Sequence, residues 1–115
     1  MNEGVLRRPF PGMAEQLNHL HNQVVAEVAT IRIVPWDTQP NYALNGAGFV
    51  VLEFPTIGIR AAEPTTVYSE SLTGALYLDK LTEVAAYSVR WKTLEGLSLD
   101  ADQSANLLAV IVKEM

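Results

Sequence analysis

The sequence contains no cysteine, so disulfide bridges, thiolate metal sites and thiol nucleophiles are all excluded. Histidine is almost as scarce, with only His19 and His21 in the chain. Two positions apart on a helix, these side chains point about 200° from each other and do not chelate one ion as an i, i+4 pair would. A serine nucleophile has no histidine base outside that helix. We therefore expect a non-enzymatic protein without a metal site or a cofactor.

Charged residues are also few, at 18% of the chain against about 25% in an average soluble domain. Eight basic residues stand against thirteen acidic ones, and Arg7-Arg8 is the only adjacent basic pair. Without a basic stripe to displace counterions from phosphates, we expect no direct binding to nucleic acid. So little charge suggests that more of the surface than usual is covered by another protein chain. We expect either a homo-oligomer or a partner protein.

Long apolar runs are absent as well, since none approaches the roughly 20 residues that span a bilayer. The first twelve residues lack the basic-then-apolar layout of a secretory signal. These observations predict a cytoplasmic protein that does not associate with membranes. With 115 residues and 49% hydrophobic content the chain can bury one core, so we expect a single domain over residues 1–115.

Apolar residues recur with helical spacing after Pro11-Gly12, which predicts a helix over 13–26. The β-branched run 30–34 then predicts a strand that ends at Pro35. Asn45-Gly46 can supply the positive φ angles of a tight turn. The nearly continuous apolar run 49–54 is typical of a strand covered on both faces, so we expect it in the middle of the sheet.

Residues 65–70 and 75–78 read as two further strands, and Gly74 allows a turn between them. Apolar spacing after Asp79 predicts a second helix that runs to about Glu95 and stops at Gly96. A third helix follows, capped by Ser98 or Asp100. Strands grouped between helices predict an α+β fold, a single layer of mostly antiparallel sheet with about four strands, flanked by one N-terminal and two C-terminal helices.

The candidate binding residues are Tyr68, Glu70 and Trp91. Tyr68 and Glu70 alternate along one strand and so share a face, where a hydroxyl beside a carboxylate can hold a ligand or a peptide. The same pair can instead form an internal hydrogen bond that fixes the sheet. Trp91 lies on the helix expected to pack on the sheet. Both a docking surface for a protein and a small-molecule effector pocket between sheet and helix stay open.

Several short motifs follow one another along the chain: Glu3 to Pro9 (EGVLRRP), Glu15 to Leu20 (EQLNHL), Val34-Pro35-Trp36, Val67-Tyr68-Ser69-Glu70, and Leu72 to Leu78 (LTGALYL). In this order they resemble the C-terminal domain of unknown function of Xre-type helix-turn-helix, antitoxin-like transcriptional regulators of actinobacteria. Two positions depart from that pattern. Gln39-Pro40-Asn41 stands where the family often has Gly-x-His, and Glu27-Val28 where it often has Pro-Asn.

The resemblance implies a regulatory or protein-interaction domain without the DNA-binding helix-turn-helix. It implies as partner a small companion protein encoded nearby, as in antitoxin-toxin-like pairs. Because the family's domain usually continues N-terminally, we expect this chain to correspond to its C-terminal half or to a short relative. A sheet without its neighbouring strand exposes an edge, which proteins cover by pairing with another chain.

Overall fold

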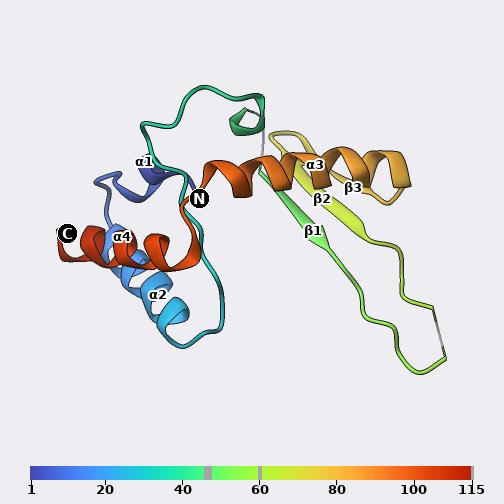
Figure 1. Cartoon of the computed structure of the whole chain (residues 1–115), viewed down its shortest axis with the longest axis horizontal. Coiled ribbons are helices and arrows are strands. Elements are labelled where there is room, and N and C mark those ends of the chain that lie inside the picture. Colours follow the sequence, from blue (N-terminus) through green and yellow to red (C-terminus); the bar gives the residue numbers. More distant parts are fainter. Residues whose placement is uncertain (46–47, 60, 115) are drawn as a thin grey trace. The chain divides into compact units, whose positions relative to one another are not determined.

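The computed structural model describes residues 1–45, 48–59 and 61–114. Its chain divides into two compact units, unit 1 with residues 1–40 and 94–115 and unit 2 with residues 41–93. The expected α+β class is confirmed (Figure 1), and the described residues form four α-helices and a three-stranded antiparallel sheet. The expectation of a single domain over the whole chain stays a prediction. The expected turn at Asn45-Gly46 lies outside the described residues.

Unit 1 is helical and holds the hydrophobic core. It contains α1 (Glu3–Leu6), α2 (Met13–Val25) and α4 (Ala101–Lys113), and α2 packs beside α4 (Figure 1). The apolar stripe of α2 buries Met13 and Leu17, as its spacing predicts. The buried cluster consists of Leu6, Met13, Leu17, Ile33, Leu108 and Ile111.

Asp100 begins α4 with the expected capping box. Its side chain accepts a hydrogen bond from the backbone N–H of Gln103 at 2.7 Å, and the Gln103 side chain accepts one from the N–H of Asp100 at 3.2 Å. Two of the helix's free N-terminal groups are thereby satisfied, which fixes where α4 starts.

The strand predicted over 30–34 is wrong. This segment is extended, but it makes a single parallel bridge, between Asn2 and Val34. Because α1 begins at Glu3, the residues after Asn2 are helical and cannot extend this bridge into a pair of strands. Ile33 instead donates its N–H to Ser104 Oγ at 2.9 Å and accepts from Leu99 N–H at 2.9 Å. The sheet therefore has three strands rather than about four.

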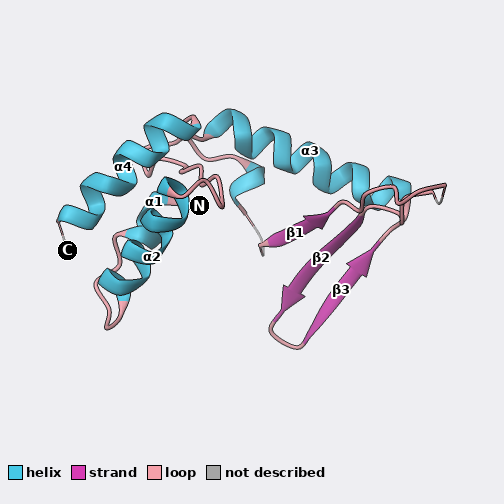
Figure 2. Ribbon diagram, turned by 90° about the horizontal axis from the view of Figure 1, so that it is seen from below, coloured by secondary structure: helices cyan, strands magenta, loops and turns pink. Residues whose placement is uncertain are grey.

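Unit 2 contains the sheet. A short 3-10 helix, η1 (Tyr42–Leu44), comes before β1 (Phe49–Leu52), β2 (Thr66–Ser71) and β3 (Gly74–Leu78), and the strand order is β1-β2-β3 (Figure 2). The run 49–54 was expected in the middle of the sheet, which is wrong, because β2 is central and β1 lies at an edge. An apolar run indicates cover on both faces but does not say which strands pair with it.

Helix α3 (Leu81–Leu97) follows the sheet and crosses the boundary between the two units. The sequence predicted that this helix stops at Gly96, but it continues to Leu97, and Ser98 N–H still donates to Leu94 O at 3.0 Å. None of the described residues of α3 is buried. The helix mixes polar and apolar residues around its surface, and its apolar residues Leu81, Val89 and Trp91 are exposed.

Candidate functional site

The pairing register of the sheet places Val50, Tyr68 and Tyr77 in one row across the three strands. Since paired residues share a face, this row defines what we call the tyrosine face of the sheet. The rings of Tyr68 and Tyr77 lie 5.1 Å apart, centroid to centroid, and are tilted by 51°. Leu52 and Glu70 alternate onto the same face along β1 and β2.

The tyrosine face is largely uncovered. Val50 is 49% exposed, Leu52 40% and Tyr77 72%. An antiparallel sheet with one wet face normally carries polar residues there. This face carries aliphatic and aromatic side chains, with Glu70 as the charged residue among those named, so its composition is that of a surface covered by protein.

Tyr68 is half-buried within this face. Its partial burial raises the pKa of the phenol above the ordinary value of 10.0, and the nearby negative charge of Glu70 acts in the same direction. The expected placement of Tyr68 and Glu70 on one face agrees with the register of the sheet.

The opposite face of the sheet meets α3. Phe49 packs edge-on against Tyr87 of α3, with ring centroids 5.1 Å apart, and the Arg90 guanidinium lies 4.9 Å from the Phe49 ring centre. Val67, in the central strand on this face, is fully buried. Trp91 is 54% exposed. The three candidate residues are therefore not brought together, because α3 contacts the face that Tyr68 and Glu70 do not occupy. Their roles stay predictions.

Arg90 is a positioning residue that the sequence did not single out. Its Nε donates to the backbone oxygen of Ala43 at 3.1 Å, and its Nη2 donates to the backbone oxygen of Asn45 at 2.7 Å. These bonds attach η1 to α3, next to the start of β1. A lone arginine in an amphipathic pattern carries no signal of such a role, which depends on carbonyl groups distant in sequence.

Exposed apolar side chains extend over the rest of unit 2. Within its described residues, only Ala43 and Val67 are buried hydrophobic residues. The exposed large ones lie on η1 (Tyr42), on the sheet (Val50, Leu52, Leu76, Tyr77), in loops (Phe54, Ile57, Ile59, Leu72) and on α3 (Leu81, Val89, Trp91). Burial of apolar surface is the main favourable term in folding. Unit 2 thus leaves many large apolar side chains in contact with water.

A family model described as a domain of unknown function (DUF5753) matches residues 1–110. The chain belongs to this family. No curated protein and no solved structure shows significant similarity to the DUF5753 domain described here. The family match covers both compact units, since residues 1–110 include all of unit 2 and nearly all of unit 1.

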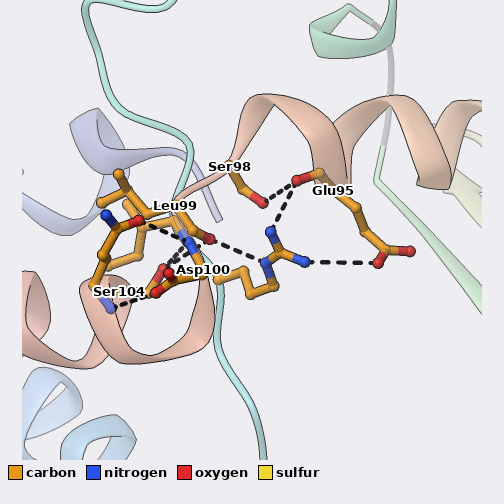
Figure 3. Close-up of polar contacts among 8 residues, drawn as sticks. Glu95, Ser98, Leu99, Asp100 and Ser104 are labelled. Atoms are coloured by element: carbon orange, nitrogen blue, oxygen red, sulfur yellow. Dashed lines mark hydrogen bonds and ion pairs between the residues drawn. The ribbon is translucent and has the colours of Figure 1, made fainter.

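The polar contacts of unit 1 in this DUF5753 domain are structural. Arg32 donates to the backbone oxygens of Leu99 at 3.0 Å and Glu95 at 2.9 Å, and its guanidinium lies 3.6 Å from the Glu95 carboxylate. Ser98 donates to Glu95 O at 3.0 Å, and Ser104 donates to Leu99 O at 3.3 Å (Figure 3). These donors satisfy the Glu95 carbonyl in the last turn of α3 and the Leu99 carbonyl in the segment between α3 and α4.

A second polar cluster surrounds Glu3, whose side chain is buried. Its carboxylate accepts from Arg7 Nε at 2.8 Å and from the backbone N–H of Trp36 at 3.2 Å. Arg7 also reaches Glu114 at 2.8 Å. The hydrogen bonds to these two carboxylates raise the pKa of Arg7 above its ordinary value. The buried carboxylate is thus paired, and the cluster joins α1 to the end of α4.

Across residues 1–45, 48–59 and 61–114, no three His, Asp or Glu side chains gather as a metal site would need. Within these same ranges, no helix has both the length and the apolar character required to cross a membrane.

Proposed function

We propose that this DUF5753 chain is a non-enzymatic regulatory or protein-interaction domain, related to the C-terminal part of Xre-type, antitoxin-like transcriptional regulators of actinobacteria. In this proposal it acts in the cytoplasm and binds a small companion protein encoded nearby, or a second copy of itself. DNA would be bound by other parts of such a regulator, because this chain carries a net charge of −5.

The observation that carries the proposal is the exposed apolar surface of unit 2. Large exposed apolar surface on a folded protein marks sites of interaction with other proteins or ligands. Here that surface includes the tyrosine face, whose central row Val50, Tyr68 and Tyr77 is aliphatic and aromatic. Tyrosines are favoured at the centres of protein interfaces, because their rings bury a large area at a small cost in side-chain entropy.

The outer side of α3 supports the same conclusion. Leu81, Ala85 and Val89 follow each other at a spacing of four and form one stripe, in which Leu81 is 88% and Val89 56% exposed. A helix that docks in a partner's groove presents such a stripe. The sheet and the helix therefore both offer surfaces suited to another protein chain.

The test is light scattering coupled to size exclusion, on this chain alone and mixed with the product of the adjacent small gene. We expect a complex whose mass is the sum of both partners. Tyr77→Lys, at a position 72% exposed, places a charge on the tyrosine face and weakens the complex. Val25→Lys is the matched control, because Val25 is 68% exposed but lies at the end of α2.

Two results would contradict the proposal. In the first, the folded chain forms no complex with itself or with the companion. In the second, Tyr77→Lys and Val25→Lys bind the companion equally well, which would place the contact away from the tyrosine face.

A further inference from the structure

Strand β3 is an edge strand with one open side. In the order β1-β2-β3, and among the residues that the structure describes, it pairs only with β2, from Val67↔Leu78 to Ser71↔Gly74. In an antiparallel ladder, alternate residues point their N–H and C=O groups away from the paired strand. The outer side of β3 therefore presents a row of backbone donors and acceptors that another strand can bind.

Nothing in the sequence of β3 blocks such pairing. Natural edge strands are protected by charged residues, by proline or by a bulge. Gly74 to Leu78 (GALYL) has no charge and no proline, and its one-to-one register with β2 contains no bulge. At the other edge strand, β1, the Arg90 guanidinium lies 4.9 Å from the ring centre of the first residue, Phe49, and the strand has four residues against five in β3. The open edge is therefore that of β3.

The charges around β3 fit a second copy of the same strand. Antiparallel pairing about a two-fold axis at Leu76 sets Leu76 opposite its own copy, Ala75 opposite Tyr77 and Gly74 opposite Leu78. No like charges meet in this register, since these five residues are uncharged. Unit 2 as a whole has five acidic and four basic residues, a net charge of −1, so repulsion between two copies is small.

We infer that two copies of this chain associate through their β3 edges, antiparallel about Leu76, to form one continuous six-stranded sheet. The inference rests on the proposed function and names one partner for it. The two tyrosine faces then join side by side into one larger apolar surface, on which the companion protein would bind. Two-fold self-pairing of this kind closes the assembly at a dimer, because each copy has one open β3 edge.

The experiment uses Leu76, which is 57% exposed and lies at the proposed axis. Light scattering of the full chain should give twice its mass of 12.6 kDa. Leu76→Lys and Leu76→Glu each set two like charges against each other, and each should weaken the dimer by about a hundredfold. An equimolar mixture of the two variants should restore it, because a lysine then faces a glutamate. Only pairing about this axis predicts that rescue.

Val25→Lys is the matched control, because Val25 is 68% exposed but lies at the end of α2 and outside the sheet. It should stay dimeric. A monomeric wild-type chain, a dimeric Leu76→Lys variant, or folded variants that do not associate when mixed would overturn the inference. A wild-type chain that stays monomeric alone but forms a complex with the companion would leave the proposed function standing while the β3 dimer falls.

Hydrogen exchange of the wild-type chain provides a second measurement that needs no variant. Amides of residues 74–78 should gain protection as the protein concentration rises from about 1 to 200 µM, in step with the dimer fraction. Protection of this strand that does not change with concentration would also overturn the inference, including where a Leu76 variant fails to fold.

Discussion

At the scale of single residues, unit 1 is held by buried polar groups that each find a partner. Ser104 is 1% exposed, and its hydroxyl accepts from Ile33 N–H and donates to Leu99 O. This one side chain replaces the strand partner that residues 30–34 would otherwise need. A serine in a helix gives no sign of such a role in the sequence, because hydroxyls on helices more often bond within their own turn.

Tyr68 gives a prediction of pH dependence. Its pKa is raised in the folded chain, so the protonated phenol stabilises the fold. This contribution is complete below the ordinary pKa of about 10 and is lost as the pH rises through the higher folded value. Titration of the phenolate absorbance should show a late step from Tyr68, which Tyr68→Phe removes and Tyr42→Phe leaves in place. Identical late titration in both variants would contradict the assignment.

At the scale of elements, Arg32 joins the extended segment 30–34 to the end of α3. Arg32→Ala should lower the free energy of unfolding by about 1–2 kcal/mol, because two carbonyl groups lose a charged donor. Arg32→Lys keeps the charge but lacks the planar fork that reaches both carbonyls, so its loss should be intermediate. Urea denaturation measures both. Equal stability of the alanine variant and the wild-type chain would show that the contacts contribute little.

The helices could be predicted more closely than the strands. Helix α2 and the capping box of α4 follow from local periodicity and spacing, which involve residues within a few positions of one another. Helix α1 was missed, because four residues are too few to show a period. The run 30–34 has the composition of a strand, but it lacks a partner strand, and the composition of a segment does not reveal its partners.

The candidate site divides along the same line. Alternation along β2 placed Tyr68 and Glu70 together on one face. The sequence did not show that Trp91 belongs to a helix on the other side of the sheet, because that depends on how the chain returns after β3. Tyr77, the ring partner of Tyr68, could be found only from the register of the hairpin.

At the scale of the whole molecule, stability and association are linked. A dimer adds binding energy to the folded state, so the melting temperature should rise with protein concentration. Leu76→Lys should show a lower melting temperature that does not depend on concentration. Differential scanning calorimetry at several concentrations checks both. A wild-type melting temperature that stays constant over a hundredfold range would contradict the link.

The uncovered surface of unit 2 also has a consequence for the lifetime of the protein in the cell. A copy without a partner displays the apolar side chains by which chaperones and proteases recognise unfolded chains. Copies that have found a partner hide them. Under the proposal, the amount of this protein is therefore set by how much of its partner is present, because any excess is degraded.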